Sequence, residues 1–141
     1  MLGNLTKAVY WTKILGNTAA GTDVSEVDGA AIDARGYDRA LFVLELGAVT
    51  SGGKLALNIQ ESANGTDFTD ITGAGFAATV ATGKSDDTIM IDVPVTKGYL
   101  RYQYQRTTAN VEFDALQVIL YNPKRIPVTQ NANVWQEIVI V

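Results

Sequence analysis

The stretch "KLALNIQESANGTDFTDI" at residues 54–71 contains an alternating strand, a turn signal and the start of a second strand. Every second residue from Leu55 to Ile59 is apolar, so these side chains share one face of an extended chain. Asn64 and Gly65 tolerate the positive φ that both central residues of a type I′ turn require. The stretch therefore predicts a β-hairpin with one buried face and one wet face.

The hairpin also contains enough acids and amides to suggest a calcium loop. An EF-hand loop needs a central glycine and a bidentate glutamate at its twelfth position. The segment "ESANGTDFTDIT", residues 61–72, has its glycine one position early and ends on threonine. The acids of "DVSEVDG", residues 23–29, also lack metal-ligand spacing. We therefore expect no metal site and interpret both acid groups as solvated turns.

Segments of similar character recur along the chain, and no window has a sustained apolar period of 3.6. This pattern predicts an all-β fold: a two-sheet antiparallel β-sandwich with jelly-roll topology. We expect one sandwich domain at residues 1–128 and a C-terminal arm or strand at 129–141. A helical turn is predicted within 22–31, and a loop at 73–85 with a short edge strand at 76–80. The predicted strands are 7–14, 29–35, 39–49, 54–62, 67–72, 88–95, 98–107, 110–121 and 134–141.

Two of these strands are apolar on both faces: "ALFVL" at 40–44 and "VILY" at 118–121. Strands of this kind are covered on both sides, or on one side by a partner. The last segment, "VWQEIVIV" at 134–141, is apolar and β-prone, so a bare edge there would favour aggregation. We expect its own sheet or a neighbouring subunit to cover it.

Composition excludes several functions. The 141 residues include no Cys and no His, which removes thiolate and imidazole catalysis and histidine-ligated metals. The net charge is −4 and the basic residues are scattered, so we expect no nucleic-acid partner. No apolar run is long enough to span a bilayer, so no membrane partner is expected. The dinucleotide-like "GAGFAA" at 73–78 has no following helix, and we predict no cofactor.

Four further segments combine into one pattern: "DGAAIDARGYDRALFVLELGAV", "LALNIQESANGTDFTDITGA", "IDVPVTKGYLRYQYQR" and "LYNPKRIPV", which together cover about 30–127. The residues that define the pattern are Asp33, Arg35, Gly36 and Tyr37; Gln60, Glu61, Ser62, Gly65, Phe68 and Asp70; Tyr99, Leu100 and Arg101; and Tyr121, Pro123, Lys124 and Pro127. In these residues the chain resembles the small capsid cement or decoration proteins of tailed bacteriophages.

The resemblance implies a non-enzymatic virion protein on the outer surface of a phage head, where it bridges and stabilises capsomers. Its partners would be the major capsid protein and itself, with a homodimer favoured over a trimer. Aromatic and arginine side chains dominate interface energetics, and the last strand is adhesive. The interface candidates are Tyr10, Trp11, Arg35, Tyr37, Lys124, Arg125, Trp135, Ile138 and Ile140.

Two alternatives remain open at this stage. A carbohydrate-binding β-sandwich that mediates adhesion would need exposed aromatic side chains on one platform, and the chain has candidates such as Trp11 and Tyr99. A glycosidase would need only two carboxylates about 5–9 Å apart, which a sequence does not reveal. We expect no catalytic residues.

Overall fold

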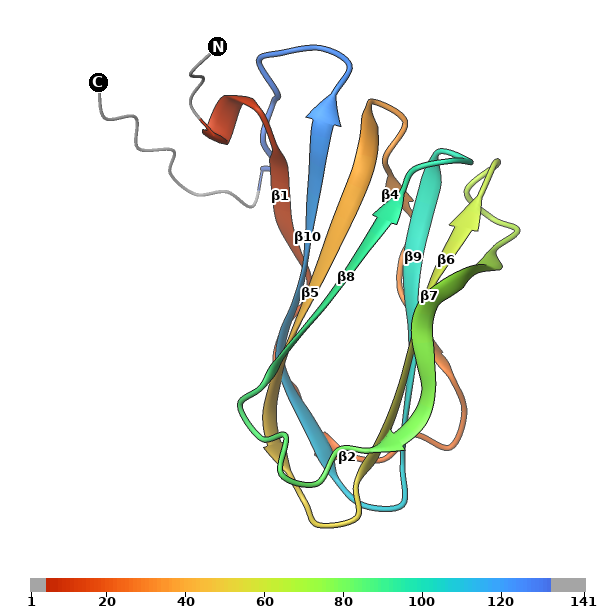
Figure 1. Ribbon diagram of the computed structural model, residues 1–141, viewed down its shortest axis with the longest axis vertical. Coiled ribbons are helices and arrows are strands. Elements are labelled where there is room, and N and C mark those ends of the chain that lie inside the picture. Colours follow the sequence, from red (N-terminus) through yellow and green to blue (C-terminus); the bar gives the residue numbers. More distant parts are fainter. Residues whose placement is uncertain (1–4, 133–141) are drawn as a thin grey trace.

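The computed structural model describes residues 5–132, and the predicted strand at 134–141 lies outside them. Two antiparallel sheets face each other as two layers (Figure 1). A single 3-10 turn, η1 (Leu5–Lys7), precedes the first strand. Sheet A contains, in order, β1 (Tyr10–Leu15), β10 (Val111–Pro123), β5 (Tyr37–Val49) and β8 (Thr88–Pro94), with β2 (Thr18–Gly21) also paired to β10. Sheet B contains β3 (Val27–Asp28) and β4 (Ile32–Asp33) beside β9 (Tyr99–Thr107), then β6 (Lys54–Ser62) and β7 (Thr69–Val80).

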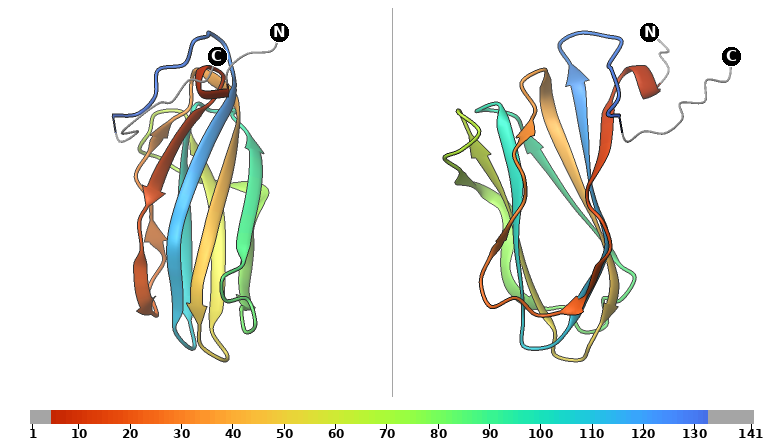
Figure 2. Two further views of the ribbon diagram at one scale, coloured as in Figure 1. Left: turned by 90° about the vertical axis from the view of Figure 1, so that its left-hand side faces the viewer. Right: turned by 180° about the vertical axis from the view of Figure 1, so that it is seen from behind.

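The chain passes repeatedly from one sheet to the other, as the two views in Figure 2 allow the reader to follow. It changes sheet after β2, β4, β5, β7, β8 and β9, and the β6–β7 connection stays within sheet B. Facing four-strand orders of β1-β10-β5-β8 and β4-β9-β6-β7 are the arrangement of a jelly roll. The predicted fold class is therefore confirmed.

The core lies between the sheets and follows the predicted alternation. Leu55, Leu57 and Ile59 of β6 are at most 2% exposed. On the facing sheet, Phe113 of β10 meets the ring of Tyr104 edge-on, with centroids 4.9 Å apart. Because successive side chains of a strand point to opposite faces, one row of each strand fills this space.

The edge strand predicted at 76–80 is confirmed, but the loop predicted at 73–75 is wrong, because β7 runs without a break from Thr69 to Val80. The small residues of this segment suit a strand that lies very close to its neighbour. A Cβ at Gly75 would come within 2.3 Å of the Leu57 carbonyl oxygen. The pairing of β6 with β7 also shifts register twice, which hides the strand from a search for strict alternation.

The helical turn predicted within 22–31 is also wrong. The backbone there bonds to β9 instead: Gly29 N donates to Tyr102 O at 2.8 Å, and β3 pairs with β9. The hairpin at 54–71 is confirmed, but its turn is not type I′. Only Gly65 of the pair has positive φ (78°), and the Asn64 side chain accepts hydrogen bonds from Thr66 N and Asp67 N at 3.0 and 2.9 Å. A side-chain-stabilised loop therefore replaces the two-residue turn.

One buried cation joins the two sheets. Arg106 of β9 is 6% exposed and forms an ion pair with Asp23 at 2.7 Å. Its Nη1 also donates to Ala19 O of β2 and to Val111 O of β10, at 2.9 and 2.8 Å. The hydrogen bond that Arg106 donates to the Asp23 carboxylate raises the pKa of Arg106. This side chain therefore connects sheet B to two strands of sheet A.

Candidate functional site

The outer face of sheet A contains adjoining apolar side chains from four strands. Register pairs Trp11 of β1 with Ile119 of β10, and Ile119 with Leu41 of β5. In the next row, Val43 of β5 pairs with Met90 of β8. Trp11 is 47% and Met90 67% exposed, and the other three are partly exposed. We call these five residues the sheet A patch.

Polar side chains surround the sheet A patch and are bonded to one another. Arg39 Nε donates to Tyr121 Oη at 2.8 Å, and Tyr121 Oη donates to Asp92 Oδ2 at 2.7 Å. Arg39 also pairs with Asp92 at 3.1 Å. The indole Nε1 of Trp11 donates to Gln117 Oε1 at 2.6 Å, which holds its ring against the sheet. The patch thus has an apolar centre and a polar rim, as protein interfaces do.

The outer face of sheet B differs, because its side chains satisfy one another. Arg101 pairs with Asp28 at 3.0 Å and donates from Nε to Gln60 Oε1 at 2.6 Å. Gln103 also donates to Asp28, at 2.8 Å, and Gln60 donates to Asp70, at 2.8 Å. This face offers a solvated, hydrogen-bonded surface.

Among the predicted interface residues, only Trp11 lies in the sheet A patch. Tyr10, its neighbour, points to the other side of β1, where its ring lies 6.2 Å from that of Tyr37. Burial raises the pKa of Tyr37. Both tyrosines are partly buried and pack against the core cluster, so each helps to hold the sandwich together.

Tyr37 also belongs to a second group of predicted residues. Together with Lys124 and Arg125 it lines a groove of about 360 Å³. Lys124 Nζ donates to Arg35 O at 3.3 Å, which brings Arg35 to the same end of the molecule. Asp33 pairs with the Arg35 guanidinium at 2.6 Å, and this hydrogen bond lowers the pKa of Asp33. The predicted residues Trp135, Ile138 and Ile140 lie outside the described residues.

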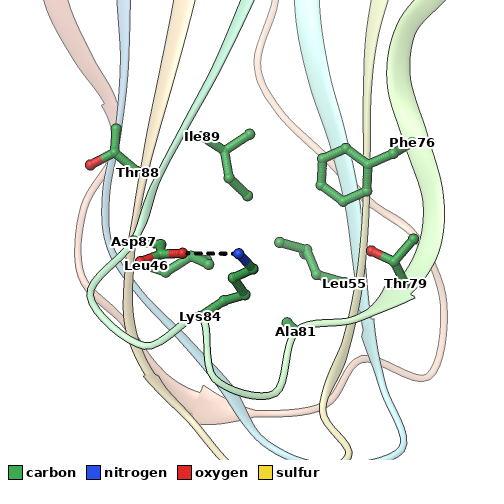
Figure 3. Close-up of a pocket in the computed structure, with 9 residues that line it drawn as sticks. All are labelled: Leu46, Leu55, Phe76, Thr79, Ala81, Lys84, Asp87, Thr88 and Ile89. Atoms are coloured by element: carbon green, nitrogen blue, oxygen red, sulfur yellow. Dashed lines mark ion pairs between the residues drawn. The ribbon is translucent and has the colours of Figure 1, made fainter.

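An apolar cavity of about 280 Å³ opens between the edge strands β7 and β8. Figure 3 shows Phe76 of β7 and Ile89 of β8 directed into it, with Leu55 at its base. Its charged groups, Lys84 and Asp87, pair with each other at 3.6 Å. The cavity therefore offers apolar contacts and no convergent polar groups.

Residues 5–132 hold no group of three side chains able to bind a metal ion. Within the same range, no helix has the length and apolar character needed to cross a membrane.

Sequence reasoning identified the strands of the sheet A patch but not the patch itself. The signal was the double-faced apolar pattern of residues 40–44 and 118–121, which includes Leu41 and Ile119. No local sequence pattern indicated that Met90 belongs to the patch or that Arg39, Asp92 and Tyr121 form a cluster, because both depend on which strands are neighbours in the sheet.

No family model and no curated protein matches this chain. Among solved structures it is similar to PBSX exported protein XepA, with a TM-score of 0.53 and 16% identity. That match covers 100% of this chain but 46% of XepA, so the chain spans less than half of that protein. The C-terminal CBM6 of LamC from Zobellia galactanivorans matches at TM-score 0.44 and 9% identity, over 78% of this chain and 98% of that one. The CBM35 from Cellvibrio japonicus Abf62 matches at TM-score 0.44 and 17% identity, over 81% and 97%. At 16% identity, the likeness to XepA shows a shared fold and nothing about function.

Proposed function

We propose that this chain is a non-enzymatic structural protein that binds the outer surface of a phage head and stabilises neighbouring capsomers. The observation that carries the proposal is the sheet A patch. One sheet presents an apolar centre with a bonded polar rim, while the other presents a satisfied polar face. Such an asymmetry suits a protein that rests one side on a larger surface and exposes the other to water.

The chemistry of the sheet A patch supports a protein partner. Trp and Met are enriched in the centres of protein interfaces, and Trp is frequent among residues that dominate binding energy. The sheet A patch extends over four neighbouring strands, so it fits a broad shell surface better than a small molecule. The partner would be the major capsid protein, and the site of action the exterior of the virion.

Stabilisation follows from mass action. Any contact made only with the assembled, expanded shell favours that state. Many copies add their effects, and self-association into a homodimer, or a trimer, would link adjacent capsomers through effective concentration.

The proposal is tested by co-sedimentation with expanded phage heads that lack this protein. The test variant is Val43→Lys, which places a charge in the middle of the sheet A patch. The matched control is Gln103→Lys, which places the same charge in the middle of the outer face of sheet B. Both variants are first compared with the wild type by circular dichroism.

We expect saturable binding of the wild type and of Gln103→Lys. We expect Val43→Lys to bind at least about tenfold more weakly, because a buried unpaired charge is strongly unfavourable. Equal binding of both variants, or no binding of the wild type to heads, contradicts the proposal.

A second candidate function uses the same face. The exposed ring of Trp11 and the Arg39–Asp92–Tyr121 cluster share the outer face of sheet A, and an aromatic ring on the same face as hydrogen-bonding groups also suits a sugar. A glycan array separates the two candidates. Glycan binding that is lost in Trp11→Ala, together with no binding to heads, would replace the head-binding proposal with an adhesion module.

A further inference from the structure

The strand β8 forms one edge of sheet A, on the side opposite β1, as the left view of Figure 2 shows. Among the strands within residues 5–132, β8 pairs with β5 alone, and its seven residues follow one register without a bulge. A regular edge strand of this kind presents a row of unpaired N–H and C=O groups to its surroundings. Sheet A can therefore be extended at β8.

Two hydrogen bonds at the ends of β8 determine which of its residues face the free edge. Leu46 N donates to Asp87 O, and Val95 N donates to Asp38 O, both at 2.9 Å. In an antiparallel ladder, every second residue of a strand bonds to the same neighbour. The odd-numbered residues of β8 therefore bond to β5. The N–H and C=O groups on the free edge belong to Thr88, Met90 and Asp92.

The free edge of β8 lacks the features that usually prevent strands from pairing. Natural edge strands are often protected by lysine, proline or a bulge. Residues 88–92, "TIMID", contain neither lysine nor proline. Their single charge, on Asp92, is already paired with Arg39 at 3.1 Å. The free edge is thus open up to Pro94, where the strand ends.

Both faces of β8 also carry apolar side chains that are incompletely covered. On the outer face, Met90 is 67% exposed. On the inner face, Ile89 and Ile91 are only partly buried and line a groove of about 320 Å³ beside β7. Phe76 and Ile89 line both this groove and the apolar cavity described above, so the two adjoin. A further strand beside β8 would cover apolar surface on both faces of the sheet.

The free edge is self-complementary in one antiparallel register. When Met90 lies opposite the partner's Met90, Thr88 lies opposite the partner's Asp92. The three residues with free backbone groups then form three hydrogen-bonded pairs, with about six N–H···O bonds. The Thr88 hydroxyl faces a carboxylate, and no two like charges lie opposite each other. A shift of the register by two residues loses one of these pairs.

We infer that two copies of this chain pair through β8 in this register and form a two-fold dimer with a continuous sheet A. A second copy is the occupant because the edge complements itself, as an isologous interface requires. The two-fold axis is perpendicular to the sheet, so both sheet A patches lie on the same side of the dimer. At the matching edge of sheet B, β7 has only small residues at 73–75, and a Cβ at Gly73 would meet nothing within 4 Å.

The dimer adds a geometry to the proposed function. Two patches on one side would allow one dimer to rest on two neighbouring capsomers. This use of the dimer rests on the proposed function, whereas the pairing through β8 belongs to the free protein. The pairing is tested without phage heads, so a negative result there would leave the binding of heads untouched.

The first test uses the two-fold axis, which places residue 90 opposite its own copy. Met90→Lys and Met90→Glu each place like charges opposite one another, whereas an equimolar mixture places opposite charges face to face. Analytical ultracentrifugation of each variant alone, and of the mixture, measures self-association. The matched controls are Gln103→Lys and Gln103→Glu, which place the same charges on the outer face of sheet B. Circular dichroism first verifies that each variant folds.

We expect the wild type and both Gln103 variants to form dimers. We expect Met90→Lys and Met90→Glu alone to dimerise at least about fivefold more weakly, and their mixture to recover dimerisation. A wild type that stays monomeric at every concentration, or that forms trimers, overturns the inference. So does a mixture that associates no better than the single variants.

The second test identifies the surface through which the dimer forms. Amide hydrogen exchange of β8 is followed by NMR at low and high protein concentration. We expect the N–H groups of Thr88, Met90 and Asp92 to exchange about tenfold more slowly, or more, at the high concentration, because paired amides exchange through opening. The N–H groups of Ile89 and Ile91 already bond to β5, so they serve as the internal control. A dimer in which the three free N–H groups gain no protection forms through another surface, and this result would overturn the inference.

Discussion

The outer faces of the two sheets are built by the same alternation and have opposite chemistry. On sheet A, the outward row of β5 is apolar at Leu41 and Val43, and neighbouring strands extend it. On sheet B, the outward row of β9 contains Arg101 and Gln103, and these bond to β3 and β6. Both sheets bury their inner rows equally well. The difference indicates that the core requires only one face of each sheet, so the outer face of sheet A is available for another role.

The comparison predicts that charged groups contribute most to the free energy of unfolding where they lie between the sheets. Arg106→Ala leaves Asp23 without its partner in a place where both side chains are largely buried, 7% and 14% exposed. We expect a loss of about 3–5 kcal/mol in the free energy of unfolding, as for other broken buried pairs. Arg39→Ala removes an ion pair on the outer face of sheet A that is 39% and 43% exposed. We expect that change to cost about 0–1 kcal/mol.

Urea denaturation of both variants measures this difference. A double variant, Arg106→Met with Asp23→Leu, serves as the control, because removing both charges should restore part of the stability. If Arg39→Ala proves as destabilising as Arg106→Ala, the view that sheet A depends little on its outer charges is wrong.

A second prediction compares the two outer faces directly. Arg101→Ala removes an ion pair to Asp28, a hydrogen bond to Gln60 and a cation–π contact 4.5 Å above the ring of Phe68. We expect it to lower the free energy of unfolding by about 1–2 kcal/mol. Val43→Thr on sheet A keeps the shape of the side chain and places its hydroxyl at the surface. We expect a cost below about 1 kcal/mol.

Thermal unfolding of the two variants under the same buffer conditions checks the order. A larger cost for Val43→Thr would mean that the outer face of sheet A is needed for folding itself. The sheet A patch would then be less suited to a role in binding.

The smallest predicted effect is a pH dependence of stability that comes from one carboxylate of sheet B. Glu61 of β6 accepts a hydrogen bond from the Thr96 hydroxyl and pairs with Lys97 at 3.1 Å. The Thr96 bond, with a further contribution from Lys97, lowers the pKa of Glu61. A lowered pKa in the folded state stabilises the fold above the unfolded pKa of about 4.3, and this stabilisation is lost as pH falls through the folded value.

We therefore expect Glu61→Gln to be less stable than the wild type by about 1 kcal/mol at pH 7, and we expect this difference to shrink as the pH falls below about 4.3. Melting temperatures of both proteins across this range provide the measurement. A constant difference between pH 7 and pH 3 would show that the ionised carboxylate is not the source of the stabilisation.

Much of the fold was predictable because local alternation determines it. The strands at 39–49, 54–62 and 98–107 were predicted within two residues of β5, β6 and β9. Prediction placed strands at 67–72 and 76–80 but missed that they form one strand, β7, because small residues and register shifts obscure the alternation between them. It also failed at the 64–65 turn, where the Asn64 side chain determines the loop through bonds to the backbone.

The site was less predictable. Aromatic and basic residues were chosen as interface candidates by type, and the structure adds that Tyr10 and Tyr37 are partly buried against the core. Residue type does not distinguish the two faces of β1, where Tyr10 points inward and Trp11 outward. The segments that are apolar on both faces, 40–44 and 118–121, were a better guide to the sheet A patch. A central strand needs only one apolar face to form the core, so its second apolar face marks a surface with another role.

The sequence by itself determined most of the longer strands and which of their residues share a face, because a period of two is a local property of the chain. It also determined the chemistry that is unavailable, through the lack of Cys and His. Only the tertiary structure decided that β1, β10, β5 and β8 lie side by side, and so joined Trp11, Ile119, Leu41, Val43 and Met90 into one surface. The same long-range pairing placed Arg106 between the sheets and brought Asp92 to Arg39. Contacts between strands distant in sequence depend on the packing of the whole molecule, and no local pattern encodes them.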